Sequence, residues 1–144
     1  MNLIIRKASV RWKGGARAGT RVLTTESGAL KQIKFSSGIP LQNDFHTDPA
    51  ELIAAAHASS FSLALSNELG LKISAAGEIA TTATVTLQQL AAGWTIINLH
   101  LNVSAKLPKL TQGEFIDATV RAKTSCLISR LLRATISLNA KLEK

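Results

Sequence analysis

The 144-residue sequence predicts an α+β fold, and three features of its pattern support this. Segments near both ends alternate as β-strands do, a long apolar segment between them carries helix start and stop signals, and a second capped helix precedes the last strand. The predicted order is three strands, a long helix, two strands, two helices and a final strand. Since no repeat or low-complexity linker interrupts the chain, we expect one domain over residues 1–144.

The N-terminal part predicts an antiparallel meander of three strands. Residues 3–12 and 20–25 are rich in β-branched and apolar side chains, and the glycine-rich stretch KGGARAG separates them. The sequence TESG predicts a second turn, after which residues 29–36 form the third strand. The stretch SSGIPLQNDFHT is then a loop that leads into the long helix.

The long helix is predicted at residues 48–69. Asp48 is a favourable N-cap, Pro49 suits the first helical position, and Glu51 completes a capping box. Gly70 is the matching stop signal. The helix is apolar around most of its circumference, which predicts that it is buried, with a second subunit helping to cover it. One apolar stripe consists of Leu52, Ile53, Ala56, Leu63 and Ala64.

Two alternating strands are expected after the long helix, at residues 77–89 and 94–107. On the second strand, polar residues that include His100 share one face. The opposite, apolar face consists of Ile97, Leu99, Leu101, Val103, Ala105 and Leu107.

The C-terminal part predicts two helices and a last strand. Thr111 and Glu114 form a second capping box, which opens a helix that ends near residue 124. Residues 125–133 predict a shorter helix, and residues 136–142 alternate as a closing strand. The apolar face of the first of these helices is Phe115, Ala118 and Ala122, with Cys126 near its end.

The charge balance is basic, with 17 Lys and Arg against nine Asp and Glu and a net charge of +8. The basic residues are scattered, and only two tryptophans and four phenylalanines are available to stack on bases. This predicts a solvated basic surface and no specific nucleic-acid partner. No apolar run reaches the roughly 18 residues that a membrane span needs, and no secretory signal opens the chain. With its single cysteine, the chain is expected in the cytoplasm, without membrane contact.

The long helix carries polar side chains at its centre. His57 and Ser60 lie three residues apart on one helix face, as a nucleophile and its base would. No G-x-S-x-G motif is present, and Glu51 lies roughly 180° around the helix from Ser60, so a serine hydrolase is not favoured. His46, in the loop, and His100, expected to be solvated, add no zinc-like spacing, and we expect no metal.

Cys126 is the single thiol of the chain. A lone cysteine is most simply a small buried hydrophobe. Its pKa would fall if the neighbouring cations Arg121, Lys123 and Arg130 pointed toward it.

Four stretches resemble the OsmC/Ohr family of osmotically inducible proteins and organic hydroperoxide reductases. They are VRWKGG through TTESG, TDPAELIAAAHASSFSLAL, AKTSCLISRLL and the final ATISLNAKL, and together they cover nearly the whole chain. The stretches AAHA and TESG resemble the OsmC branch more than the Ohr branch. The resemblance implies antiparallel sheets around a long buried central helix, in an intertwined homodimer with its active sites at the subunit interface.

The resemblance also implies a thiol peroxidase. Its substrate is a small hydroperoxide, an external dithiol is the reductant, and no cofactor or metal is needed. Ser60 falls at the position of the attacking cysteine, and Cys126 falls at the position of the resolving cysteine. His57 and Phe61 are expected to line the substrate pocket.

The chain departs from the family pattern at several positions. The family glutamate falls on Ala50, so Glu51 matches only its neighbour. Leu127 replaces the usual proline after the second cysteine. Arg17 lies in the turn that carries the family arginine, although an ungapped alignment puts Ala18 there.

Two explanations of Ser60 stay open, an engineered Cys-to-Ser change and natural divergence. The chain as given is expected to be inactive, or nearly so, as a peroxidase. The alternative function is a catalytically inactive OsmC-like protein that binds a small ligand.

Overall fold

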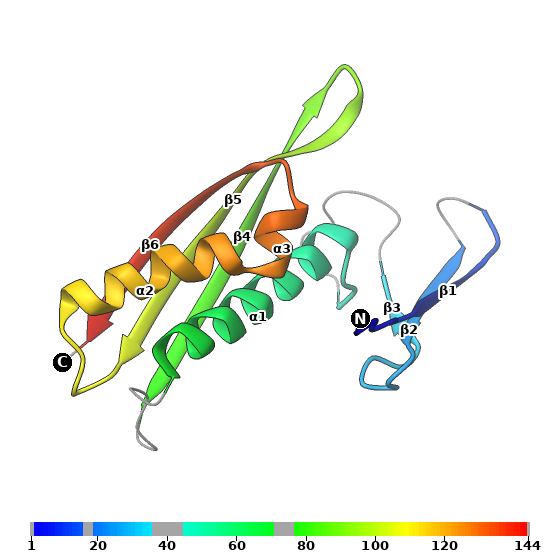
Figure 1. Cartoon of the computed structure of the whole chain (residues 1–144). Helices are drawn as coiled ribbons and strands as arrows, with labels where there is room; N and C mark the ends of the chain where they lie inside the picture. Colours follow the sequence, from blue (N-terminus) through cyan, green and yellow to red (C-terminus); the bar gives the residue numbers. More distant parts are fainter. Residues whose placement is uncertain (1, 16–18, 36–44, 71–76, 144) are drawn as a thin grey trace. The chain divides into compact units, whose positions relative to one another are not determined.

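The computed structural model describes residues 2–15, 19–35, 45–70 and 77–143 (Figure 1). The chain divides into two compact units, Met1–Leu52 and Ile53–Lys144. Each unit contains one three-stranded sheet, with strand orders β1-β2-β3 and β4-β5-β6.

The sheet of the first unit is the predicted antiparallel meander. It consists of β1 (Ala8–Lys13), β2 (Thr20–Thr25) and β3 (Ile33–Lys34). The first strand starts at Ala8, later than predicted, because β2 ends at Thr25, the partner of Ala8, and the chain turns after it. The third strand is also shorter than predicted, since residues 25–30 close a turn in which the Thr25 N–H donates to the Leu30 carbonyl at 2.8 Å.

This first sheet buries little of its own apolar surface. Leu23 is the only buried hydrophobic residue among the described residues of the unit, and every residue of β1 is exposed. The Trp12 ring stacks edge-on against Phe35 at 6.5 Å, and the Arg21 guanidinium lies 4.9 Å from the Trp12 ring centroid. Even so, Trp12 stays 49% exposed, so these two contacts do not bury the ring.

The long helix α1 (Pro49–Leu69) begins and ends as predicted. The Asp48 carboxylate accepts the Glu51 N–H at 2.9 Å, and Gly70 adopts φ = 53°, a left-handed conformation that suits glycine at a helix end. Within the second unit, one face of the helix meets a sheet and a second helix, and its cover by a second subunit stays a prediction. The fully buried stripe is His57, Phe61, Leu65 and Leu69, whereas Leu63 of the predicted stripe is 65% exposed.

The second sheet has the long central strand β5 (Gly93–Lys106) between β4 (Glu78–Leu90) and β6 (Thr135–Glu143). The β4–β5 pair is an antiparallel hairpin, but β5 and β6 run parallel. Parallel strands need a crossover connection, which here contains α2 (Gln112–Ser125) and α3 (Leu127–Leu131). The expectation of purely antiparallel sheets is therefore wrong for this pairing.

The alternation of buried and exposed residues along β5 is interrupted by a β-bulge. Thr86 pairs with Asn98 but the next residue, Leu87, pairs with Ile96, so Ile97 has no partner on β4. Ile97 is 40% exposed and does not share the buried face, which corrects its predicted place. The remaining residues of that face, from Leu99 to Leu107 in alternation, are buried as predicted.

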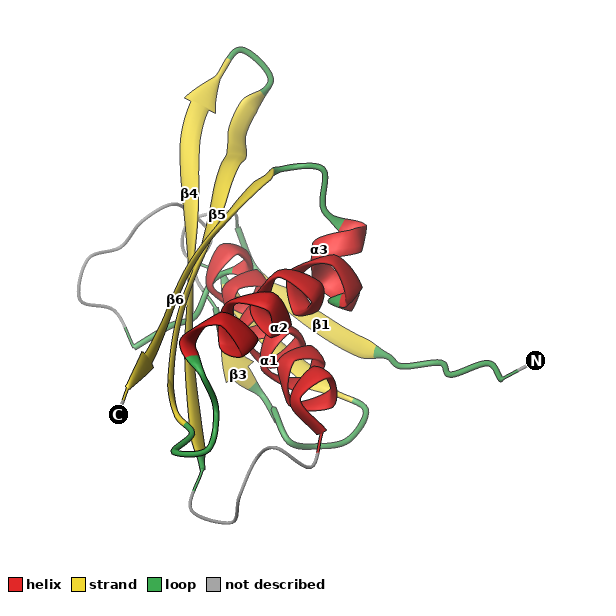
Figure 2. Ribbon diagram, turned by 60° about the vertical axis from the view of Figure 1, so that its left-hand side comes forward, coloured by secondary structure: helices red, strands yellow, loops and turns green. Residues whose placement is uncertain are grey.

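The helices of this unit cover one face of the sheet (Figure 2). The predicted capping box of α2 is confirmed: Thr111 Oγ1 accepts the Glu114 N–H at 3.3 Å, and the Glu114 carboxylate accepts the Thr111 N–H at 3.0 Å. The buried stripes of α1 and α2 and the buried face of β5 meet in one core. Its buried residues are Phe61, Leu65, Leu69, Leu101, Val103, Ala105, Leu107, Phe115, Ala118, Ala122 and Cys126.

Candidate functional site

Cys126 is positioned by two helix ends at once. It is the C-cap of α2 and the N-cap of α3. Its N–H donates to the Ala122 carbonyl at 2.8 Å, and its own carbonyl accepts the Arg130 N–H at 3.0 Å. These backbone bonds fix the position of the residue, and its side chain is fully buried.

Ser60 of α1 lies directly against this thiol. The Cys126 thiol donates to Ser60 Oγ over 3.3 Å, although the two residues are 66 positions apart in the chain. Ser60 itself is half-buried. The structure thus brings together the two positions that the family motifs mark for redox chemistry.

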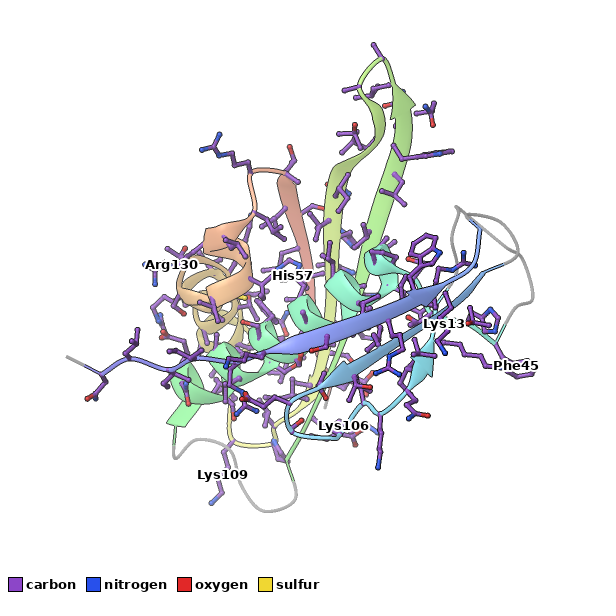
Figure 3. All side chains as sticks on the ribbon, turned by 90° about the vertical axis from the view of Figure 1, so that its right-hand side faces the viewer. Lys13, Phe45, His57, Lys106, Lys109 and Arg130 are labelled. Atoms are coloured by element: carbon purple, nitrogen blue, oxygen red, sulfur yellow. The ribbon has the colours of Figure 1, made fainter. Side chains whose placement is uncertain are left out.

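A second contact joins His57 to Ser129. His57 Nε2 lies 2.9 Å from Ser129 Oγ, and the histidine side chain reaches from α1 toward α3 (Figure 3). The Ser129 hydroxyl also lowers the pKa of the Cys126 thiol, which lies three residues earlier in the chain. Two hydrogen-bonded pairs, His57 with Ser129 and Cys126 with Ser60, therefore lie where α1 meets the junction of α2 and α3.

The contact between His57 and Ser129 differs from the sequence interpretation in two respects. His57 is paired with Ser129 and not with Ser60, its neighbour on the helix face, so the arrangement differs from the serine–histidine pair that we considered. Sequence reasoning missed Ser129 altogether, because one serine in a five-residue helix gives no periodic signal.

The surroundings of Cys126 favour its thiolate. Burial raises the pKa of the thiol, but hydrogen bonds from the Ser129 and Ser60 hydroxyls and from the peptide N–H groups of Ser129 and Ile128 outweigh burial and lower the pKa overall. The neighbouring cations are not the cause. Arg121, for instance, pairs with Glu68 at 2.8 Å.

His57 is fully buried, and burial lowers the pKa of its imidazole. The ring is therefore neutral near pH 7, with one nitrogen as donor and the other as acceptor. Nε2 is bonded to Ser129, whereas Nδ1 has no hydrogen-bond partner among the described residues. An unpaired polar atom in a core is destabilising, so Nδ1 is available to a further hydrogen-bond donor.

Stability at mildly acidic pH is expected to depend on His57. The folded chain holds the imidazole pKa below its ordinary value of 6.5, so the unfolded chain binds the proton more readily. The histidine therefore favours the folded state above about pH 6.5, and this contribution is lost as the pH falls through the lower, folded pKa. Chemical denaturation between pH 4.5 and 8 should show a shallower acid loss for His57→Gln than for the parent chain. A His100→Gln variant is the matched control, and equal slopes for all three proteins would contradict the prediction.

The other residues singled out in the sequence lie outside these two pairs or outside the described residues. Glu51 is exposed in the first turn of α1, and Arg17 falls outside the described residues. Phe61 is fully buried in the core. His100 is half-buried with Nδ1 2.6 Å from Ser137 Oγ, so the expectation of a solvated residue is wrong. His46 is half-buried ahead of α1.

Leu127 occupies the first helical position of α3 and is 70% exposed. Proline is favoured at this position of a helix because the N–H there has no intrahelical acceptor. The departure from the family proline thus falls at a site where the side chain carries little packing.

In the part of the chain that the structure describes, no group of three or more His, Cys, Asp or Glu residues could hold a metal ion. Nor is any described helix long and apolar enough to cross a membrane.

Comparison with known proteins places the chain in a family. Residues 41–141 match the family described as OsmC-like protein. Over 140 residues, the chain is 34% identical to the peroxiredoxin OsmC of Escherichia coli (strain K12), with 97% of this chain and 98% of the relative covered. The chain belongs to the OsmC family. A peroxiredoxin OsmC of Shigella flexneri matches over the same length with the same identity.

Solved structures support the OsmC fold. An OsmC-like protein from Vibrio cholerae superposes with a TM-score of 0.78 at 16% identity, covering 96% of this chain and 99% of that one. The organic hydroperoxide resistance protein OhrB of Bacillus subtilis gives a TM-score of 0.70 at 23% identity, covering 99% and 100%. At these identities the likeness concerns the fold, which is the α+β fold predicted from the sequence.

Proposed function

We propose that this OsmC-family chain has the scaffold of a thiol-dependent hydroperoxide reductase, with Ser60 at the attacking position and Cys126 at the resolving position. The observation that carries the proposal is the 3.3 Å contact between these two side chains, which come from α1 and from the start of α3. The names of the relatives, peroxiredoxin and organic hydroperoxide resistance protein, support the reaction class.

The two-cysteine cycle explains why the side chain at position 60 matters. An attacking thiolate takes one peroxide oxygen and becomes a sulfenic acid, and the resolving thiol then condenses with it to a disulfide and releases water. An external dithiol reduces the disulfide by exchange. The Ser60 hydroxyl forms neither a sulfenic acid nor a disulfide, so this chain as given does not complete the cycle.

The proposal includes a homodimer in the cytoplasm, without a cofactor and without nucleic-acid or membrane partners. Apolar side chains that the single chain leaves in solvent support a second subunit, among them Leu63 of α1 and Val10 and Trp12 of β1. A homodimer would cover such surfaces and complete the burial of α1.

Restoring the thiol tests the proposed function. Ser60→Cys should consume an organic hydroperoxide with dithiothreitol as reductant, because the new thiol would stand next to Cys126. The rate is measured as loss of peroxide and gain of alcohol, against the parent chain.

Ser59→Cys is the matched control, since Ser59 is exposed and its hydroxyl donates to the Ala55 carbonyl at 2.6 Å, away from the two hydrogen-bonded pairs. Turnover by Ser60→Cys no faster than by Ser59→Cys would refute the enzyme scaffold. That result would favour the alternative, an OsmC-like protein that binds a small ligand.

A further inference from the structure

A surface depression of about 290 Å³ lies where α2, α3 and the start of β6 meet. Two of the side chains that line it are cations, two carry hydroxyl groups, and two are branched and apolar. They are Lys123 and Arg130, Thr124 and Ser129, and Val120 and Ile136. No acidic side chain is among them, so the depression combines positive charge with an apolar wall.

The two cations have no carboxylate partner among the described residues. By contrast, Arg121 of the same helix α2 pairs with Glu68 at 2.8 Å. The helix dipole favours a cation in the last turn of a helix, which explains Lys123 in α2 and Arg130 in α3 separately. The dipole does not require both cations to line one depression without a carboxylate. That arrangement suits an anion from solution.

The hydroxyl groups of the depression are already used within the chain. The Thr124 hydroxyl donates to the Val120 carbonyl at 3.2 Å, and Ser129 Oγ lies 2.9 Å from His57 Nε2. The two cations are therefore the groups that are left to hold the charge of a ligand. An arginine guanidinium is able to bind both oxygens of one carboxylate, while a lysine acts as a point charge beside it.

The size of the depression limits the ligand. A molecule of liquid water occupies about 30 Å³, so the depression holds a ligand of roughly ten non-hydrogen atoms. The hydrocarbon part of such a ligand would gain free energy by covering Val120 and Ile136. A nucleoside phosphate is too large for this volume, and no aromatic side chain lines the depression for a base to stack on.

We propose that this depression binds a small monocarboxylate whose hydrocarbon part is aromatic or branched, for which benzoate is a model. Lys123 and Arg130 hold the carboxylate, and Val120 and Ile136 contact the hydrocarbon. The inference goes beyond the proposed function, because binding here needs no redox chemistry. The residues named in support of a homodimer, on α1 and β1, do not line the depression.

The test titrates the full chain with sodium benzoate at low ionic strength and follows the backbone amides by ¹H–¹⁵N NMR. We expect saturable shifts at residues 120–124, 129–130 and 136, with a Kd on the order of 1 mM for a ligand of this size. Benzyl alcohol has no charge and acetate has almost no hydrocarbon, so each should bind at least about tenfold more weakly.

The same titrations contain the results that would overturn the proposal. No saturable shift with benzoate, or shifts confined to other residues, would refute the site. Benzyl alcohol that binds as tightly as benzoate would show that the cations hold no carboxylate. Acetate that binds as tightly as benzoate would leave an adventitious anion only, and the proposed ligand class would be wrong.

Charge variants test the two residues that hold the carboxylate. Lys123→Gln and Arg130→Gln should each weaken benzoate binding about tenfold, since each removes a hydrogen bond to a charged group. Neither residue belongs to the buried core, and circular dichroism checks that the variants fold. Added sodium chloride should also weaken binding by the parent chain.

Lys109→Gln is the matched control, because it removes one positive charge at an exposed residue. Lys109 lies in the turn ahead of α2, at the end of that helix opposite to Arg130 (Figure 3). This variant should bind benzoate like the parent chain. If it weakens binding as much as Arg130→Gln does, the net charge of +8 attracts benzoate without a defined site, and the proposal is refuted.

The benzoate titration and the turnover test of Ser60→Cys have independent outcomes. Benzoate has no peroxide bond, so its binding does not depend on a thiol. Binding without turnover would refute the reductase scaffold alone, and turnover without binding would refute the carboxylate site alone.

Discussion

An oxidised Ser60→Cys variant is expected to be more stable than the same variant kept reduced, by up to about 4 kcal/mol. The Cys126 sulfur lies 3.3 Å from the side-chain oxygen of residue 60, so a small shift closes the bond. The disulfide would join positions 66 residues apart, and a closed loop of this length strongly restricts the unfolded chain. Guanidinium denaturation with and without dithiothreitol measures the difference.

The control is again Ser59→Cys, whose new thiol would lie on the exposed side of α1. Diamide should give an intramolecular bond in Ser60→Cys, seen as a linked peptide pair by mass spectrometry under non-reducing conditions, and none in Ser59→Cys. A Ser60→Cys protein with the same unfolding midpoint whether oxidised or reduced, or linked only between chains, would contradict the contact.

Phe115→Ala is expected to lower the free energy of unfolding by about 3–5 kcal/mol. The Phe115 side chain is fully buried at the first turns of α2, in the core cluster that joins both long helices to the sheet. Removing the ring loses its transfer free energy and leaves a cavity that the surrounding side chains fill only in part. Urea denaturation followed by circular dichroism measures the loss.

Val120→Ala on the same helix is the matched control, because Val120 is 55% exposed and lies outside the core cluster. Its effect should stay within about 0.5 kcal/mol. If the two variants lose the same free energy, the face of α2 that packs on the sheet has been assigned wrongly.

The helices could be predicted from the sequence because their ends carry local chemistry. The Asp48 cap and the Thr111–Glu114 capping box need only neighbouring residues, and the structure contains both contacts. The alternation of the last part of β5 was equally visible, since burial from Leu99 to Leu107 depends on one sheet face.

What the sequence did not reveal depends on contacts between distant segments. The parallel pairing of β5 with β6 follows from the crossover through α2 and α3, and the bulge that exposes Ile97 follows from the register against β4. The face of α1 that meets the core could not be chosen from the sequence, because a helix that is apolar on most sides gives no unique stripe.

The candidate site also depends on contacts between distant segments, which the sequence did not reveal. Helical periodicity gave no reason to place Ser60 beside Cys126, and only the resemblance to a family pointed to the pair. Ser129 carried no sequence signal, because its contact with His57 depends on α3, which begins directly after the cysteine.

Cys126 caps both α2 and α3 with its main-chain atoms, so neither helix end depends on its side chain. Only main-chain atoms of this residue close α2 and open α3, through Ala122 and Arg130, so both turns survive exchange of the thiol for another small side chain. Related proteins with the same helix junction are therefore able to lose or regain a cysteine at this position while they keep both helices. The side chain at position 126 is therefore free to change without loss of either helix end.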